Sequence, residues 1–403
     1  MNVFSDFRSC RHADLSLQTM NIGFDAKRAF HNGTGLGHYS RTLIRSLAEY
    51  YPGHQYYLFN PKKTQRFSIN GNNIHEILPE KFPATLFRSA WRSSWVTKDL
   101  KRLGIHLYHG LSHEIPFGIH KTGIKSVVTI HDLIHIRYPE QYNPIDVRIY
   151  DKKYRYACAN ADKIIAISKQ TKQDIIDFYK TPEERITVCY QSCNPAFAQQ
   201  VKEQEKKSVK EKYNLPEQYF LYVGSVIERK NLLNICKAIF SLRGVLEIPL
   251  VVIGDGGKYK QQVKDFIMQN GLGKQVVFLS EKPGIKTDDD FQTAKSFPAI
   301  YQSALAMIYP SVFEGFGIPV LEALFSGLPV ITSNVSCLPE AGGDAAYFVD
   351  PLNTAEIAGA MKRIYSDHEL VASMKAKGFR YAQNFSVQKT TEGVMNVYKG
   401  LIV

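Results

Sequence analysis

The chain has 403 residues, of which 44% are hydrophobic and 12% aromatic, and its formal net charge is +12. This composition is typical of a globular protein, and the length indicates at least two domains because single cores stop growing at roughly 250–300 residues. The sequence has no low-complexity tract and no apolar run near the roughly 20 residues of a membrane span, which excludes fibrous and membrane-spanning classes.

The N-terminal segment, residues 1–19, is polar and has neither a strand period nor a helix period. We expect a disordered tail there, and a translation start at Met20 is an equally good interpretation. The segment lacks the apolar core of a signal peptide, so we expect a cytoplasmic protein.

Positive charge is concentrated in the first half of the chain. Residues 1–198 hold 27 basic and 17 acidic side chains, a difference of +10, whereas the remainder holds 23 and 21, a difference of +2. A basic surface suits a partner that carries phosphate, such as nucleic acid, an anionic membrane or a lipid pyrophosphate.

Short apolar runs alternate with helical patterns through the first half, residues 20–196. The predicted strands are 21–26, 55–60, 107–110, 126–132, 161–168 and 186–190, and the predicted helices are 38–51 and 168–179. A glycine-rich loop follows the first strand, and Ser168 is placed to cap the second helix. This alternation predicts an α/β domain with a parallel sheet that is covered on both faces.

A charged, polar segment at residues 197–215 is predicted to link this domain to a second one, residues 216–385. There the predicted strands are 219–225, 249–256, 275–280, 305–311 and 329–333, and the predicted helices are 230–242 and 259–271. Doubly wound units bind ligands at the carboxyl ends of their strands, so we expect a site in the cleft between the two.

The residues after the strand at 305–311 have an unusual order, because Glu314 and Glu322 enclose Gly315, Gly317 and Pro319. The glycines allow a sharp turn and a close approach to a ligand, and the proline suits the first position of a helix. The free N–H groups of that helix can bind an anion, and carboxylates accept hydrogen bonds from sugar hydroxyls. An anion flanked by two such acids describes a nucleotide sugar, and a capped helix with surface acids is the alternative.

This stretch, EGFGIPVLE at residues 314–322, resembles the signature of retaining glycosyltransferase family 4. The segments at 33–44, 127–133, 161–175, 220–231 and 338–351 resemble the same family, in the same order. The resemblance implies the GT-B fold, with two Rossmann-like domains facing a central cleft and residues 386–403 as a helix that crosses back to the first domain. It also implies transfer of a hexose from a nucleotide diphosphate sugar with retention of configuration, without a metal or other cofactor.

Within that family the chain looks most like bacterial mannosyltransferases of surface-polysaccharide assembly. This likeness makes GDP-mannose the expected donor and a glycan or lipid-linked molecule the expected acceptor. The expected partners are therefore the donor, the acceptor and an anionic membrane surface. We expect the protein to be peripheral on the inner face of that membrane and to bind no nucleic acid.

The resemblance also assigns roles in the second domain. Glu314 would hold hydroxyls of the transferred sugar, and Phe316 and Gly317 would offer backbone N–H groups nearby. Glu322 would bind the ribose diol of the nucleotide.

Two cations, Arg229 and Lys230, would bind the diphosphate and stabilise the charge of the leaving group. Many relatives carry an arginine directly after the Val-Gly dipeptide, where this chain has Ser225, so the cationic role falls on Arg229. A solvated turn is the alternative for this pair.

In the first domain, the resemblance places Gly35 and Gly37 beside the donor phosphates and the acceptor, and His131 against the transferred sugar. A plain tight turn is the alternative for the glycines, whose spacing differs from the dinucleotide-binding pattern. A structural histidine held by the backbone is the alternative for His131. His109, at the end of another strand, is open to either interpretation.

Two patterns that resemble metal sites favour other interpretations. Cys189 and Cys193 have no second pair of Cys or His to complete a zinc site. Asp288, Asp289 and Asp290 lie in a long connection without an anchoring strand, which favours solvated loop acids. We therefore expect no bound metal.

Residues 87–102 combine aromatic and basic side chains: Phe87, Trp91 and Trp95 with Arg88, Arg92, Lys98, Lys101 and Arg102. Aromatic residues four positions apart share a helical face. This face either packs on the domain core or meets an anionic membrane near a lipid-linked acceptor.

Two other functions fit parts of the sequence. A nucleotide-sugar epimerase on the same fold would convert the donor without an acceptor. A non-catalytic binder of nucleic acid or membrane would show salt-sensitive affinity for polyanions, although the sequence lacks RNA-reading motifs.

Overall fold

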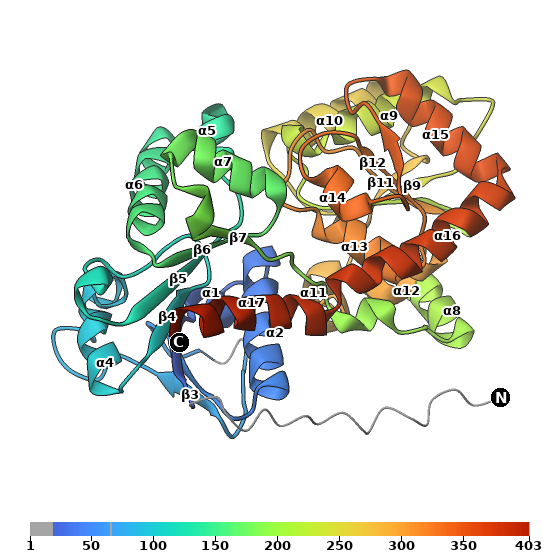
Figure 1. Cartoon of the computed structure of the whole chain (residues 1–403). Coiled ribbons are helices and arrows are strands. Elements are labelled where there is room, and N and C mark those ends of the chain that lie inside the picture. The colour runs from blue at the N-terminus through green and yellow to red at the C-terminus, as the bar shows by residue number, and fades with distance from the viewer. Residues whose placement is uncertain (1–18, 65–66, 403) are drawn as a thin grey trace.

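The structure of the chain is a computed structural model that describes residues 19–64 and 67–402. It contains two parallel β-sheets, one in each half of the sequence, and helices cover both faces of each sheet (Figure 1). The predicted α/β architecture with two doubly wound units is confirmed. The tail expected at residues 1–19 lies outside the described residues, apart from Thr19.

The first sheet has the strand order β3-β2-β1-β4-β5-β6-β7, and all its neighbouring strands are parallel. Its strands are β1 (Asn21–Asp25), β2 (Gln55–Phe59), β3 (Ile74–Ile77), β4 (Leu107–Gly110), β5 (Lys125–Ile130), β6 (Lys163–Ala166) and β7 (Ile186–Val188). Sequence patterns missed β3, because this edge strand of four residues contains a histidine and a glutamate and is only partly buried.

Helices of the first half pack on opposite faces of this sheet. They are α1 (Lys27–His31), α2 (Gly35–Tyr50), α3 (Arg88–Ala90), α4 (Val96–Arg102), α5 (Ile134–Arg137), α6 (Pro144–Asn160) and α7 (Lys169–Tyr179). One apolar cluster joins α1 and α2 to one face, and a second joins α4, α6 and α7 to the other. The β-branched runs of the central strands are therefore buried on both sides.

The second sheet has the strand order β10-β9-β8-β11-β12-β13 and is also parallel throughout. Its strands are β8 (Phe220–Val223), β9 (Leu250–Ile253), β10 (Val276–Phe278), β11 (Ala306–Tyr309), β12 (Val330–Ser333) and β13 (Tyr347–Val349). Sequence patterns missed β13, which has only three residues.

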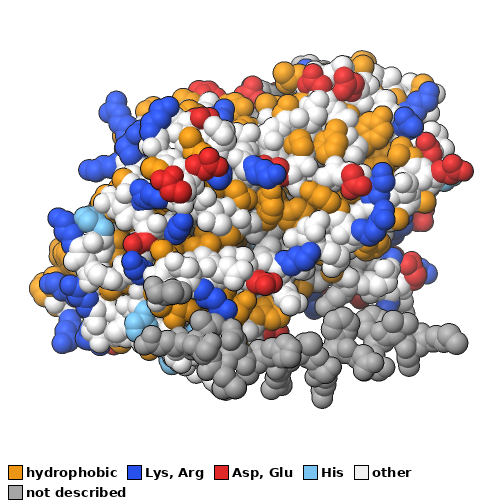
Figure 2. All heavy atoms as spheres, viewed as in Figure 1, with side chains coloured by type: hydrophobic (Ala, Val, Ile, Leu, Met, Phe, Trp, Pro, Cys, Tyr) orange, Lys and Arg blue, Asp and Glu red, His pale blue; other side chains and the backbone are white. Residues whose placement is uncertain are grey.

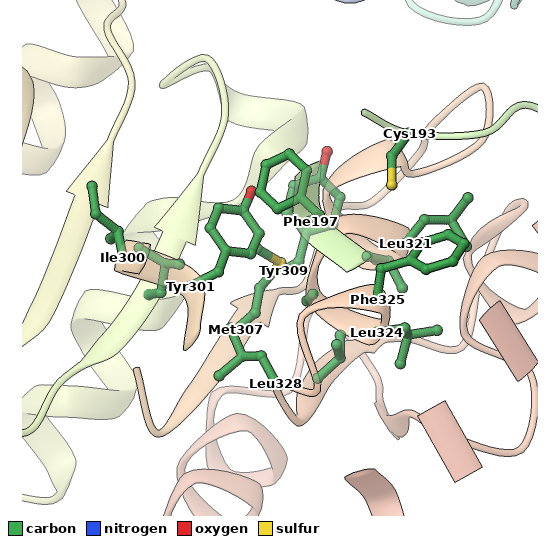
Figure 3. Packing of buried hydrophobic residues seen from close by; sticks show 14 of the residues in the cluster. Cys193, Phe197, Ile300, Tyr301, Met307, Tyr309, Leu321, Leu324, Phe325 and Leu328 are labelled. Atoms are coloured by element: carbon green, nitrogen blue, oxygen red, sulfur yellow. The ribbon is translucent and has the colours of Figure 1, made fainter. Parts of the chain in front are cut away.

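The helices of the second half also form two layers. They are α8 (Glu203–Lys212), α9 (Leu232–Ser241), α10 (Lys258–Gln269), α11 (Asp289–Gln292), α12 (Phe297–Ser303), α13 (Ile318–Phe325), α14 (Leu338–Gly342), α15 (Thr354–Ser366) and α16 (His368–Ala382). Helices α9, α10 and α15 cover one face, and α8, α12 and α13 cover the other. Figure 3 shows part of the apolar cluster beneath α8, α12 and α13, in which Tyr301 and Tyr309 lie among side chains that include Phe197 and Leu321.

The last helix, α17 (Val387–Ile402), packs against α2 in the first half of the chain (Figure 1). Its residues Met395 and Tyr398 are fully buried there. The Tyr398 hydroxyl lies 2.5 Å from Nδ1 of His109, whose Nε2 lies 2.8 Å from the Thr129 hydroxyl. These contacts show that His109 is a structural residue that ties the C-terminal helix to the first sheet.

The strand order reverses between β1 and β4 in the first sheet and between β8 and β11 in the second. Adjacent connections leave in opposite directions at such a point, and the crevice that opens at the carboxyl ends of the strands is the usual ligand site of doubly wound sheets. The two crevices locate the candidate site before any side chain is considered.

Residues 87–102 do not form the single amphipathic helix expected from the aromatic spacing. A π-helical turn at Trp91–Trp95 separates α3 from α4, and Phe87 precedes the first helical residue. Trp91 is 2% exposed and its Nε1 donates to Asp99, whereas Phe87 is 53% exposed and Trp95 36% exposed. The prediction of one shared aromatic face is therefore wrong, because the π turn changes the angle between successive side chains.

Among the described residues, no helix has both the length and the apolar composition needed to cross a membrane.

Candidate active site

The loop between β11 and α13 carries the central acid of the site, Glu314. Each of the two glycines in this loop avoids a different steric clash. Gly317 has φ +107°, and a Cβ there would lie 2.9 Å from Cδ2 of Leu338. A Cβ on Gly315 would lie 2.2 Å from the backbone oxygen of His131, so the loop touches the first half of the chain directly. Side chains at these positions would push the loop away from both neighbours.

Glu314 is only 8% exposed and is surrounded by hydrogen-bond donors. Its Oε2 lies 3.1 Å from Nη1 of Arg229, and its Oε1 lies 2.9 Å from Nζ of Lys230. The hydroxyls of Tyr309 and Ser311 each donate to Oε1 at 2.9 Å. Burial opposes ionisation, but Lys230 and Arg229 outweigh it and lower the pKa of Glu314 to about 2. The carboxylate is therefore charged at every working pH.

The two cations come from a 3-10 turn, Glu228–Lys230, that follows β8. Arg229 also donates from Nη1 to the backbone oxygen of Phe313, and its buried Nε has no partner among the described residues. Lys230 donates to the Tyr309 hydroxyl as well as to Glu314. Both cations contact the Glu314 carboxylate in the crevice between β8 and β11, and the half-buried Asp132 is a second acid near Arg229. The cationic N–H donors of Arg229 and Lys230 are the groups that suit a phosphate there.

Glu322 lies on α13 in a different environment from that of Glu314. Its Oε2 accepts a hydrogen bond of 2.7 Å from the Tyr301 hydroxyl, and within residues 19–64 and 67–402 it forms no ion pair. Burial raises the pKa of Glu322 to about 7, although the Tyr301 hydrogen bond acts in the opposite direction. The structure thus brings Glu314, Arg229 and Lys230 into one cluster and keeps Glu322 apart from it.

His131 follows β5 and has both ring nitrogens occupied. Nε2 lies 2.9 Å from the Leu111 backbone oxygen, which only accepts, so Nε2 carries the proton. Nδ1 then accepts from the side-chain amide of Gln191 at 2.8 Å. Burial lowers the pKa of His131 to about 4, so the ring is neutral. Its backbone oxygen, rather than its ring, contacts the loop that carries Glu314.

Gly35 and Gly37 open α2 behind Thr34. The space around Gly35 is empty, whereas a Cβ on Gly37 would lie 1.9 Å from the backbone oxygen of Asn32. Gly37 is therefore required by a tight turn, and Gly35 leaves the start of a 16-residue helix accessible.

Contacts between the two halves surround the loop of Glu314. The Ser168 hydroxyl donates to the Gly315 backbone oxygen at 2.7 Å, in addition to capping α7 through the Thr171 N–H. Glu340 of α14 accepts hydrogen bonds from the N–H groups of Lys169 and Gln170, at 2.8 and 3.1 Å. A carboxylate of the second half thus caps a helix of the first half.

Sequence reasoning missed these contacts and also the roles of Tyr301, Tyr309 and Ser311. The only available signals were the position of Ser311 at the predicted strand end and of Glu340 inside a family-like segment. A partner separated by more than a hundred residues leaves no periodic pattern.

The other acids and thiols lie outside this cluster. Asp288 caps α11 and, together with Asp290, pairs with Lys212 at 2.9 and 3.2 Å. The described cysteines are buried and reduced, including Cys189 and Cys193. Within residues 19–64 and 67–402, no group of three or more His, Cys, Asp or Glu side chains is arranged to hold a metal ion.

Two family models match the chain, one in each half. Residues 33–197 match the model described as "Glycosyltransferase Family 4", and residues 203–381 match the one described as "Glycosyl transferases group 1". Among curated proteins, the O-antigen chain mannosyltransferase B of Escherichia coli is 27% identical over 384 residues, which cover 91% of this chain and 96% of that protein.

Solved structures share the arrangement of both sheets. Anabaena Alr3699/HepE, solved in complex with UDP and glucose, has a TM-score of 0.68 at 14% identity. The match covers 95% of this chain and 100% of that chain. WaaG, a glycosyltransferase involved in lipopolysaccharide biosynthesis, has a TM-score of 0.67 at 18% identity, with 94% of this chain and 100% of that chain covered. At these identities the likeness shows the fold, and the predicted GT-B fold is confirmed.

Proposed function

The chain belongs to the group 1 glycosyltransferases of glycosyltransferase family 4, a family of retaining enzymes, and from this premise we propose that it transfers a hexose from a nucleotide diphosphate sugar to a glycan or lipid-linked acceptor. The observation that carries the proposal is the cluster of Glu314, Arg229 and Lys230 at the switch point of the second sheet. The cluster combines an acceptor of sugar hydroxyls with cations for a diphosphate.

The cations act on the leaving group in this proposal. Negative charge develops on the diphosphate as the bond to the sugar breaks, and fixed cations in a buried site stabilise that charge without reorganising. The unpaired Nε–H of Arg229 is a donor that a phosphate oxygen can use. Arg229 and Lys230 thereby take the place of a metal ion, and we propose that turnover needs none.

Glu314 has two tasks in this scheme. It holds both cations in position, and its carboxylate accepts hydrogen bonds from hydroxyls of the transferred sugar. The backbone N–H groups of Phe316 and Gly317 lie next to it on the same loop, and Glu322 binds the ribose diol further along α13. The His131 ring is held by Leu111 and Gln191, so it contacts the sugar only if the Gln191 hydrogen bond is exchanged.

The proposed donor is GDP-mannose and the proposed process is surface-polysaccharide assembly. Support comes from the relative at 27% identity, whose name describes an O-antigen chain mannosyltransferase. The basic first half supports an acceptor that carries phosphate, with Gly35 at the accessible start of α2. A cytoplasmic location, peripheral on the inner face of the membrane, is part of the same proposal.

A transfer assay tests the function directly. Purified protein is incubated with GDP-mannose, UDP-glucose or UDP-galactose, a glycan acceptor and EDTA, and the product is examined by NMR for the anomeric configuration. We expect a mannosylated product that keeps the configuration of the donor and forms in the presence of EDTA. Conversion of the donor without an acceptor would instead identify an epimerase, and rescue of an EDTA-inhibited enzyme by Mg²⁺ would contradict the metal-free site.

A binding assay tests the cations separately. Arg229→Ala and Lys230→Ala should lower the affinity for the nucleoside diphosphate strongly. They should change the affinity for the nucleoside little, because only the diphosphate contacts the cations. Lys274→Ala, which removes an exposed lysine just before β10 at the amino ends of the strands, is the matched control and should leave both affinities unchanged. Equal losses for the two ligands in the cation variants would contradict the assignment.

A further inference from the structure

The connection between β12 and α14, residues 334–337, packs against the loop that carries Glu314. The hydroxyl of Ser336 accepts a hydrogen bond from the Glu314 N–H at 3.2 Å and donates one to the Glu314 backbone oxygen at 3.0 Å. A hydroxyl can do both at once, because it has one donor and two lone pairs. The thiol of Cys337 contacts the same backbone oxygen at 3.0 Å. Both polar groups of the Glu314 backbone are therefore bound by a single side chain, that of Ser336.

Two hydroxyls of β12 make similar contacts with the chain before Glu314. The Thr332 hydroxyl donates to the backbone oxygen of Tyr309 at 2.9 Å, and the Ser333 hydroxyl donates to that of Ser311 at 2.6 Å. Both donors are fully buried. Tyr309 and Ser311 are the residues whose own hydroxyls donate to Oε1 of Glu314. The three backbone oxygens bound in this way thus belong to the residues that set the position of the carboxylate.

The backbone of Ser336 has φ +58°, in the left-handed region that residues other than glycine rarely adopt. A glycine would adopt this conformation without steric cost. Strained residues of this kind cluster at functional sites and persist where the surrounding structure fixes them. The hydroxyl is the group that serine has and glycine lacks, and this hydroxyl contacts Glu314.

We propose that Ser336 is a positioning residue for sugar transfer, whose hydroxyl fixes the Glu314 backbone so that the carboxylate faces the transferred sugar and the two cations. The inference rests on the proposed function and adds to its site a residue that does not touch the donor. Without the hydroxyl, the Glu314 N–H loses its partner and the loop relaxes. A displacement of about 1 Å in a catalytic group can lower a rate by about 10²-fold.

Three substitutions at this position separate the hydroxyl from the backbone strain. Ser336→Ala should lower kcat by about 10–100-fold and change KM for the donor little, because Arg229 and Lys230 still bind the diphosphate. Ser336→Gly should lower kcat equally but melt at a higher temperature than Ser336→Ala, because glycine relieves the strain. Ser336→Thr keeps the hydroxyl and should retain kcat, although it should melt lower, since a branched side chain strains a left-handed backbone more. A merely structural residue would lose stability and activity together.

A double-mutant cycle shows whether Ser336 acts through Glu314. In the Glu314→Gln background, Ser336→Ala should lower kcat much less than it does in the wild type, because residues that act as one unit are not additive. Ser326→Ala is the matched control, since the buried Ser326 hydroxyl also donates to a backbone oxygen, that of Phe197 at 3.3 Å, outside the Glu314 cluster. It should keep wild-type kcat.

The pH dependence of stability tests the same positioning without any transfer reaction. Within the described part of the chain, the titratable groups that face Glu314 include Arg229, Lys230, Tyr222, Tyr309 and Cys337 of the second half, and Asp132 and Tyr142 of the first. Against the effect of burial, Lys230 and Arg229 lower the pKa of Glu314 from 4.5 to about 2. This contact therefore stabilises the fold above pH 4.5 and is lost as the pH falls towards 2.

Melting temperatures are measured for the wild type and Ser336→Ala at pH 6 and pH 3. A carboxylate that turns away from the cations loses the contact, so the variant should fall further below the wild type at pH 6 than at pH 3. Exposed acids are scattered over the surface of both halves (Figure 2), and because they titrate alike in both proteins they cancel in the difference. In the Glu314→Gln background the loss should be the same at both pH values.

The proposal is overturned if Ser336→Ala keeps near-wild-type kcat, if its kcat loss adds in full to that of Glu314→Gln, or if its loss of stability is the same at pH 6 and pH 3. Should the wild type transfer no sugar from any donor, the proposed function fails. The comparison of melting temperatures then still decides whether Ser336 holds the Glu314 carboxylate against its cations.

Discussion

Glu314 sets the charge balance of the candidate site, because it is the acid that both Arg229 and Lys230 contact. Glu314→Gln keeps the size of the side chain and removes the charge. We expect kcat/KM to fall on the order of 10²-fold, since a positioned hydrogen-bonding group in the site is lost. Circular dichroism should show an intact fold, and near-wild-type turnover would contradict the role.

The same variant should also be less stable, because two buried cations lose their partner. The folded-state pKa of Glu314 is depressed from 4.5 to about 2, so its contribution to stability is present above pH 4.5 and is lost as the pH falls towards 2. A nucleoside diphosphate supplies a replacement anion, and it should raise the melting temperature of the variant more than that of the wild type. An equal rise in both proteins would show that the ligand does not meet these cations.

Glu322 should make donor binding depend on pH near neutrality. Its pKa of about 7 means that the carboxyl is protonated below pH 7 and charged above it, and the charged form accepts hydrogen bonds from both ribose hydroxyls. Calorimetry should therefore show nucleoside diphosphate affinity rising with pH through 7 and then levelling. Glu322→Gln should flatten the profile, and Tyr301→Phe should move the inflection to higher pH, because the hydroxyl that stabilises the charged form is gone. Identical profiles in all three proteins would refute the role of Glu322.

At the scale of elements, the connection from β11 to α13 depends on the backbone of Gly317. Gly317→Ala should destabilise the protein by about 1–3 kcal/mol, because φ +107° is strained for alanine and the new Cβ meets Leu338. Gly359→Ala is the matched control, since Gly359 lies inside α15 with nothing within 4 Å of an added Cβ, and it should stabilise by up to about 1 kcal/mol. Chemical denaturation of both variants checks this, and a harmless Gly317→Ala would show that the loop has room to rearrange.

At the scale of the whole molecule, the two halves are joined by the carboxylate of Glu340 at the start of α7. Glu340→Gln should weaken this contact by about 1–2 kcal/mol, because hydrogen bonds to a charged acceptor become neutral ones. Small-angle X-ray scattering should then show a larger radius of gyration without donor. Glu356→Gln is the control, because the Glu356 carboxylate accepts hydrogen bonds from Asp350 and Asn353, which both belong to the second half. An unchanged radius would mean that other contacts hold the halves together.

The sequence by itself determined the fold class, the positions of most strands and the loop that carries Glu314. These features are local, because strand and helix periods report which residues are buried, and glycine and proline restrict the backbone where they stand. The family resemblance named the cations and the acids of the site. It did not say which of them meet.

Only the tertiary structure decided which side chains of the site contact one another. The order of β8 and β11 in the sheet brings Arg229 against Glu314 across 85 positions of sequence, and Gln191 occupies the ring nitrogen of His131 that a sugar would need. The π turn likewise buried Trp91 and exposed Trp95, although their spacing indicated a common face. Such pairings depend on how distant segments are stacked, and the pattern of a single segment carries no information about what packs against it.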